Sequence, residues 1–197
     1  MTERAINGFF IAFFIGWLVS YSLFHVPANF LWTCNVGFIL TALATLRGGS
    51  GLVFSVCLIL VAVADGLWLI DVLGRLFTGR HWLGGTAYMF SSEIPLHVRL
   101  FSLEHAFLTP FLIYKLMGKG YDSTALRYGV LLVPVVYYLT WLLADPTSEV
   151  NWVWGLWGNT QSFMPAALYP LLAASVFVLV LIVPAHFLAK RFLPQKR

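Results

Sequence analysis

A long apolar stretch of the chain, "LVFSVCLILVAVADGLWLIDVLGRL", runs from Leu52 to Leu76. A helix that rises about 1.5 Å per residue needs about 20 apolar residues to cross the hydrocarbon core of a bilayer. The stretch exceeds that length, and its only acidic residues are Asp65 and Asp71. It therefore predicts a membrane-spanning helix that carries two carboxylates at membrane depth.

The composition of the whole chain favours the same class of protein. Of its 197 residues, 60% are hydrophobic and 10% are charged, whereas soluble domains carry roughly 25% charged residues. A soluble protein of this size could not bury so much apolar surface in one core. The basic residues behind the net charge of +4 are dispersed at loop positions, where they set membrane topology. We therefore expect lipid as the surroundings and no nucleic-acid partner.

Further apolar segments predict an all-α polytopic membrane protein, a six-helix transmembrane bundle that forms a single transmembrane domain over residues 1–197. Each segment is long enough to cross a bilayer. The expected helices cover residues 6–24, 27–46, 52–76, 97–117, 125–144 and 164–189.

The distribution of Lys and Arg predicts the orientation of this bundle. With the N-terminus inside, nine basic residues fall on the cytoplasmic side and three on the opposite side. Positive charge is retained on the cytoplasmic side of membrane proteins. We therefore expect a multi-pass protein of the bacterial inner membrane, with both termini cytoplasmic.

Two long aromatic outer loops are expected, at residues 77–96 and 145–163. They either form an aromatic belt at the headgroup level, where Trp is enriched, or fold back as lids over an outward-facing cavity. Trp152 and Trp154 of the second loop are candidate cofactor contacts, together with Asn35 in the second span.

A small set of polar residues lies where polar groups are rare. Ionisable side chains at membrane depth cost several kcal/mol and normally face protein or water. At 1.5 Å per residue, Glu104 and His105 lie about 12 Å below the outer surface and Asn35 about 13 Å below it. The cytoplasmic half has almost no such residues, so the pattern predicts an outward-facing buried acid/histidine pocket. The set is Asn35, Asp65, Asp71, His97, Glu104 and His105.

The residue types of this set suit several chemistries. Glu104, His105, Asp65 and Asp71 are candidate catalytic residues of an intramembrane enzyme that acts on a lipid or an apolar small molecule. His97, His105 and Glu104 are candidate ligands of a divalent metal, which would activate a water molecule. However, no HExxH spacing is present, and adjacent residues such as Glu104 and His105 point in different directions on a helix.

Other functions remain open from the sequence. Buried acids and histidines form proton relays in transporters, which suits a small proton-coupled carrier. They also form hydrogen-bond networks that only hold helices together. In that case the chain would be a non-catalytic subunit of a larger membrane complex, contacting a pigment, quinone or haem through its aromatic residues. A membrane-protein partner or a homo-oligomer is compatible with either function.

Local spacing gives expectations for individual side chains. Asp71 and Arg75 are four residues apart, which suits an ion pair on one helix, whereas Asp65 needs a partner on another helix. Asp65 and Asp71 differ by about 120° around the helix, so both face protein only if this helix is central. Pro110 cannot donate a backbone hydrogen bond and weakens the helix near His105.

Three stretches carry a resemblance to known proteins: "LWTCNVGFILTALA", "GTAYMFSSEIPLHVRLFSLEHAFLTPF" and "VNWVWG". Together they resemble segments of bacterial multi-pass integral membrane proteins. The resemblance implies the same helical membrane fold over most of the chain, and it implies no activity.

Overall fold

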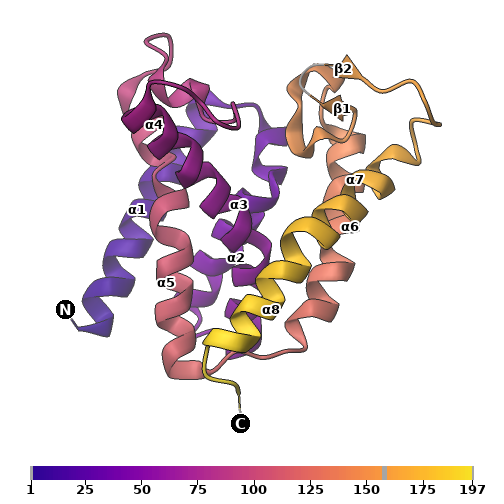
Figure 1. The fold of residues 1–197 in the computed structure, drawn as a ribbon. Helices are drawn as coiled ribbons and strands as arrows, with labels where there is room; N and C mark the ends of the chain where they lie inside the picture. Colours follow the sequence, from indigo (N-terminus) through magenta and orange to yellow (C-terminus); the bar gives the residue numbers. More distant parts are fainter. Residues whose placement is uncertain (1, 157–158, 197) are drawn as a thin grey trace.

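The computed structural model describes residues 2–156 and 159–196. The chain is mostly helical, and its long helices run side by side between two ends (Figure 1). One end carries both termini, and the other carries the long connections with the two short strands.

Four helical segments of the described chain are long and apolar enough to cross a membrane. They are α1 (Glu3–Phe24), α3 (Gly51–Thr78), α6 (Ala125–Leu143) and the continuous C-terminal segment Tyr169–Phe192. The hydroxyl of Ser50 accepts a hydrogen bond from the backbone of the first turn of α3, so this helix begins where the glycine-rich turn ends.

Two of the expected spans contain shorter helices. The second begins with the 3₁₀ turn η1 (Pro27–Leu31) and continues as α2 (Thr33–Leu46), which has 14 residues. The fourth is divided into α4 (Leu96–Phe101) and α5 (Glu104–Lys119), which has 16 residues. Neither α2 nor α5 alone reaches the length of about 20 residues that a bilayer requires.

The C-terminal segment is continuous but not uniform. It consists of α7 (Tyr169–Phe177), the π-helical turn η5 (Val178–Ile182) and α8 (Val183–Phe192). The widened turn ends two residues before Pro184, which has no backbone N–H to continue the α-helical ladder. Local widening of this kind accommodates such a missing bond without ending the helix.

The long connections contain short regular elements. In the first, η2 is a 3₁₀ turn; in the second, two 3₁₀ turns precede an antiparallel pair of strands. These elements are η2 (Ala87–Phe90), η3 (Pro146–Ser148), η4 (Val150–Trp152), β1 (Gly155–Leu156) and β2 (Asn159–Thr160).

Helix α3 is the central helix of the bundle. It packs against α2, α5, α6 and α8. Asp65 and Asp71 are each only 1% exposed although they leave the helix in different directions. Asp65 faces α5, and Asp71 is covered by the loop that follows α3. The contact with α2 is especially close at Gly37, where an added Cβ would lie 2.4 Å from Val61 Cγ1.

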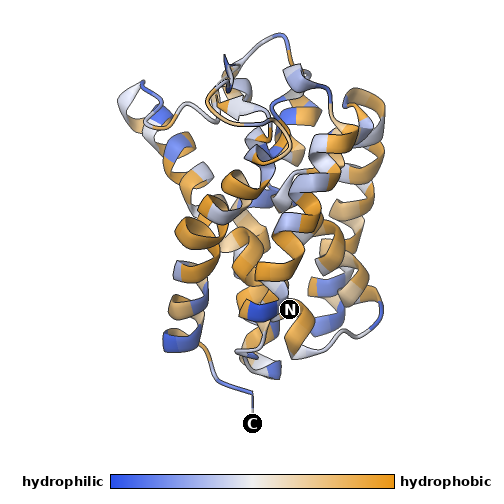
Figure 2. Cartoon of the chain, turned by 90° about the vertical axis from the view of Figure 1, so that its right-hand side faces the viewer, coloured by the Kyte–Doolittle hydropathy of each residue, from blue (hydrophilic) through white to orange (hydrophobic). Residues whose placement is uncertain are grey.

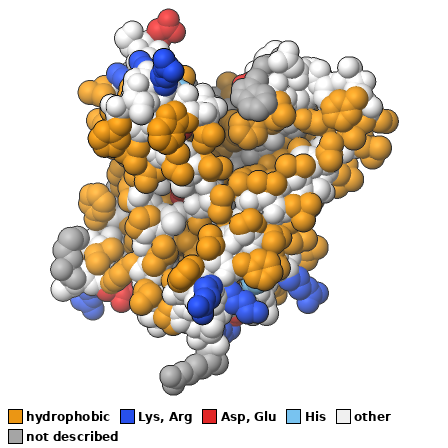
Figure 3. Space-filling view, in the orientation of Figure 1, with side chains coloured by type: hydrophobic (Ala, Val, Ile, Leu, Met, Phe, Trp, Pro, Cys, Tyr) orange, Lys and Arg blue, Asp and Glu red, His pale blue; other side chains and the backbone are white. Residues whose placement is uncertain are grey.

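The outer surface of the bundle is apolar. Large hydrophobic side chains such as Leu23, Phe77, Leu142 and Phe192 are exposed. Figure 2 shows hydrophobic stretches of helix between more hydrophilic ends. Figure 3 shows hydrophobic side chains over the middle of the visible face, with Lys and Arg toward its two ends. This distribution is that of a protein surrounded by lipid.

Candidate functional site

The centre of the candidate site is a contact between α3 and α5. His105 Nδ1 lies 2.9 Å from Asp65 Oδ1, and the hydroxyl of Thr109 donates to Asp65 Oδ2 at 2.9 Å. Thr109 follows His105 by one helical turn, so both side chains reach α3 from the same face of α5. The partner that Asp65 requires is thus supplied by another helix.

Glu104 extends this contact on the other side of the histidine ring. Its Oε1 atom lies 3.5 Å from His105 Nε2, and the residue is only 3% exposed. The expectation that the two side chains diverge is therefore wrong. Helix α4 ends at Phe101 and α5 starts at Glu104, so Glu104 occupies the first position of a new helix, where its side chain can turn toward its neighbour.

One oxygen of this cluster stands apart from the other polar atoms. Glu104 Oε2 is buried and forms no hydrogen bond with any residue that the structure describes. Buried polar atoms in folded proteins are nearly always paired, so each exception needs an explanation. Glu104 lies within electrostatic reach of Tyr21, Cys34 and Tyr88, and His105 is in direct contact with it.

Aromatic side chains cover the histidine. The ring of Trp68 lies 5.1 Å from the ring of His105, and Trp68 Nε1 donates to the hydroxyl of Tyr88 at 2.9 Å. Burial raises the pKa of Tyr88 to about 12, so its hydroxyl is protonated at neutral pH.

Asn35 lies next to this cluster and connects three elements. Its Nδ2 atom donates to the hydroxyl of Tyr21 at 2.8 Å and to the backbone carbonyl of Asn29 at 2.8 Å. Both amide hydrogens are thereby used, so Asn35 holds α1, η1 and α2 together. Its effect on the site is to position the hydroxyl of Tyr21.

The proposed metal ligands do not form a metal-binding group. The carboxylates of Asp65 and Glu104 contact opposite nitrogens of the His105 ring, so their oxygens do not surround a common centre. His97 instead packs against Phe24, with ring centroids 5.0 Å apart. Within residues 2–156 and 159–196, no three His, Cys, Asp or Glu side chains are placed to hold a metal ion.

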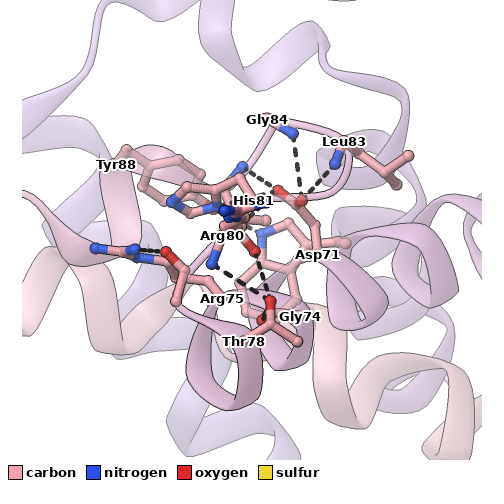
Figure 4. Close-up of polar contacts among 12 residues, drawn as sticks. Asp71, Gly74, Arg75, Thr78, Arg80, His81, Leu83, Gly84 and Tyr88 are labelled. Carbon is pink, nitrogen blue, oxygen red and sulfur yellow. Dashed lines mark hydrogen bonds and ion pairs between the residues drawn. The ribbon is translucent and has the colours of Figure 1, made fainter.

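Asp71 belongs to a different cluster, shown in Figure 4. Its Oδ1 atom accepts from the backbone of Leu83 at 2.6 Å and Gly84 at 3.2 Å. Its Oδ2 atom accepts from the backbone and hydroxyl of Thr86 at 3.0 and 2.7 Å. The structure therefore places this candidate catalytic residue at the base of the loop between α3 and α4.

The local ion pair expected for Asp71 does not form. Arg75 Nη1 donates to the carbonyl of Gly79 at the end of α3, and its guanidinium lies 5.8 Å from the centroid of the Phe90 ring. The residue that approaches Asp71 is His81, with Nδ1 3.5 Å from Oδ2. Loop backbone satisfies this carboxylate more completely than a single side chain four residues away would.

Trp152 and Trp154 form a third cluster, on the second long connection. Trp152 packs edge-on against Trp32, with ring centroids 5.7 Å apart, and Trp154 packs against Trp141 at 5.5 Å. The Nε1 atoms of Trp141 and Trp154 are both buried, and neither has a hydrogen-bond partner within residues 2–156 and 159–196. These candidate cofactor contacts are thus separate from the Glu104 cluster.

Sequence reasoning missed four residues of the central site. Thr109 had a usable signal, because it lies one turn from His105. Tyr21, Trp68 and Tyr88 had none, because each comes from a different element and aromatic residues are abundant throughout the chain.

No protein family model, curated protein or solved structure matches this chain. The chemistry of the site therefore follows from its own geometry. A carboxylate that holds one nitrogen of an imidazole fixes the orientation of the ring and leaves the other nitrogen to exchange a proton. In this site that second nitrogen faces Glu104.

Proposed function

We propose that this protein is an intramembrane enzyme whose acid–base site is formed by Glu104, His105 and Asp65, and that it acts on a lipid or another apolar small molecule. The observation that carries the proposal is the buried, unpaired Oε2 atom of Glu104. A network that only joined helices would have satisfied this atom, because an unpaired buried polar group costs stability. An acid beside an oriented histidine suits proton transfer to a bound molecule.

Each residue has a distinct role in this proposal. Thr109 holds Asp65, and Asp65 orients His105 through Nδ1. His105 exchanges a proton with Glu104 through Nε2, and Glu104 Oε2 exchanges it with the bound molecule. Asp71 has no role in this proton transfer, because its two oxygens are occupied by the loop.

The proposed enzyme is a multi-pass protein of the bacterial inner membrane, with six spans and both termini cytoplasmic. The bias of nine basic residues against three supports this orientation. The common end of the two termini in Figure 1 is compatible with it. Lys115 is paired with Glu3 at 2.7 Å and lies 6% exposed, so its charge adds less to the bias than an exposed lysine would.

A second candidate is a subunit of a larger membrane complex that contacts a quinone, pigment or haem. The indole N–H groups of Trp141 and Trp154, which are buried and find no acceptor among residues 2–156 and 159–196, favour it, because a carbonyl or carboxylate of such a group would accept from them. Purification in a mild detergent tests this function. A co-purifying partner or a chromophore absorption that is lost in Trp154→Phe would support it.

Turnover of membrane lipid tests the enzymatic proposal. Wild-type protein, Glu104→Gln and His105→Gln are reconstituted in vesicles of bacterial total lipid extract, and the lipids are compared over time by mass spectrometry. We expect the wild type to consume a species that both variants leave intact. The control is Glu93→Gln, a change at an exposed loop carboxylate, which should retain turnover.

Two results would contradict the proposal. One is the absence of any consumed species with the wild type, and the other is unchanged turnover in Glu104→Gln. Elemental analysis of the same samples decides the part played by metal. If the wild type holds a stoichiometric metal that either variant loses, the reaction is metal-assisted and not simple acid–base catalysis.

A further inference from the structure

The loop between α3 and α4 is attached to α3 by the Asp71 carboxylate, and farther along by hydrogen bonds from Trp68 to Tyr88 and from Arg99 to the Met89 carbonyl. Asp71 accepts four hydrogen bonds from Leu83, Gly84 and Thr86, at distances between 2.6 and 3.2 Å. The hydroxyl of Thr86 also lies 3.2 Å from His81 Nδ1. Figure 4 shows the loop backbone bending around the Asp71 carboxylate.

Apolar burial contributes less to this attachment. Trp82 is 61% exposed and Leu83 51% exposed, although one face of the Trp82 ring covers Gly74. A segment with few buried apolar contacts opens at a lower free energy than the helices it covers. The hydrogen bonds of Asp71 therefore have a large share in keeping the loop in place.

The same loop carries Tyr88 to the acid–base site. The hydroxyl of Tyr88 accepts from Trp68 Nε1 at 2.9 Å, and the Trp68 ring lies beside His105. Tyr88 is also within electrostatic reach of Glu104 and Cys34. Release of the loop would thus withdraw one wall of the site.

We propose that Asp71 is a positioning residue that latches the loop of residues 79–95 over the Glu104–His105 site, and that ligands enter when this loop detaches. The inference rests on the proposed function, since it treats the cluster as a ligand site. Asp71 acts through Tyr88 and does not touch the reacting atoms. The acidic residue that sequence reasoning assigned to catalysis would then control access to it.

The two cysteines of the chain provide a direct test. Cys34 lies within electrostatic reach of Glu104 and Tyr88 and is partly exposed, whereas Cys57 is 0% exposed in the core. Detergent-solubilised protein is treated with a water-soluble maleimide, and the labelling rate of each cysteine is followed by peptide mass spectrometry. The Cys34 rate reports the opening of the loop, and the Cys57 rate reports unfolding of the bundle.

Asp71→Asn should raise the labelling rate of Cys34 by about tenfold or more, because the negative charge and one of the two acceptor oxygens are lost and the open state becomes more populated. Labelling of Cys57 should not change. Tyr88→Ala should also raise the labelling rate of Cys34, because it removes one wall of the site while the hydrogen bonds of Asp71 stay in place. The matched control is Asp122→Asn, which changes a loop carboxylate of a different connection and should leave Cys34 unaffected.

Either of two results would overturn the latch. In one, Asp71→Asn labels Cys34 at the wild-type rate, whether or not Tyr88→Ala raises that rate. In the other, Cys57 becomes labelled in parallel with Cys34, which would mean that Asp71 supports the whole bundle. If Asp71→Asn cannot be purified, Thr86→Val takes its place. This variant removes one of the four hydrogen bonds, so it should raise the Cys34 labelling rate by a smaller factor. Since labelling requires no turnover, this result is independent of the lipid experiment.

Discussion

Asn151 shows how a single residue joins distant parts of the chain. Its side chain is buried, and its backbone has a left-handed φ of 51°. Its Nδ2 atom donates to the Leu31 carbonyl at 2.7 Å and to the Thr140 hydroxyl at 3.0 Å. Its Oδ1 atom accepts from the backbone and hydroxyl of Thr33, each at 3.0 Å. The second long connection is thereby fixed to η1, α2 and α6.

Asn151→Ala should lower the free energy of unfolding by about 2 kcal/mol or more, because buried backbone groups of Leu31 and Thr33 lose their partner. Asn151→Gly removes the same amide but relieves the left-handed backbone, so it should be less destabilising than the alanine variant by about 1 kcal/mol. Denaturant unfolding in detergent micelles measures both. Equal stability of Asn151→Ala and wild type would contradict this role.

At the scale of elements, the contact between α2 and α3 depends on a glycine. A Cβ at Gly37 would lie 2.4 Å from Val61 Cγ1, whereas a Cβ at Gly66 of α3 would meet no atom within 4 Å. The two positions therefore separate the effect of close packing from the effect of glycine in a helix.

Gly37→Ala should destabilise the protein by about 1–3 kcal/mol, because the two helices must move apart. Gly66→Ala should be neutral or stabilising by up to about 1 kcal/mol, since alanine favours the helix. Thermal unfolding of the two purified variants gives the comparison. A Gly37→Ala variant as stable as Gly66→Ala would show that this contact is not tight.

A second element-scale feature is the attachment of the C-terminal tail to the turn between α5 and α6. Gln195 forms a parallel bridge with Tyr121. Asp122 accepts from Lys196 Nζ at 2.8 Å and from the backbone and hydroxyl of Thr124 at 3.0 and 2.6 Å. The hydrogen bonds from Lys196 and then Thr124 lower the pKa of Asp122 to about 2.

Because the pKa of Asp122 is lower in the folded protein than in the unfolded chain, the ionised carboxylate stabilises the fold at pH above about 4. This contribution should decrease as the pH falls from about 4 to about 2. Lys196 is 53% exposed, so solvent screens part of the interaction and we expect about 1–2 kcal/mol. The stability difference between wild type and Asp122→Asn should therefore shrink over this range. A difference that is constant with pH would refute the attachment.

At the scale of the whole molecule, the bundle has two unlike ends. Both termini lie at one end and the long connections at the other (Figure 1). Reporter fusions test the proposed orientation: a cytoplasm-active fluorescent protein should be active at either terminus, and a periplasm-active phosphatase should be active only in the loops at 79–95 and 145–163. Phosphatase activity at one terminus would exclude a structure with both termini cytoplasmic.

Much of the architecture follows from local sequence. The length and hydropathy of 52–76 predicted the central helix, and its two acids, both buried, required the protein surroundings that they have. The need of Asp65 for a partner on another helix was also evident, because no cation lies nearby on its own helix. These conclusions depend on hydrophobic length and on the angle between residues of one helix, which the sequence contains directly.

The composition of the site was decided by the tertiary structure. The break between α4 and α5 brings Glu104 beside His105, and the path of a loop gives Asp71 its partners and carries Tyr88 to Trp68. Side chains from separate elements meet only after the loop paths and the helix crossing angles are set. The repeat of hydrophobic residues along one helix does not specify those paths or angles. The sequence by itself therefore determined a helical membrane protein with buried acids. Only the folded chain separated the acid of the central site, Glu104, from the acid that holds the loop, Asp71.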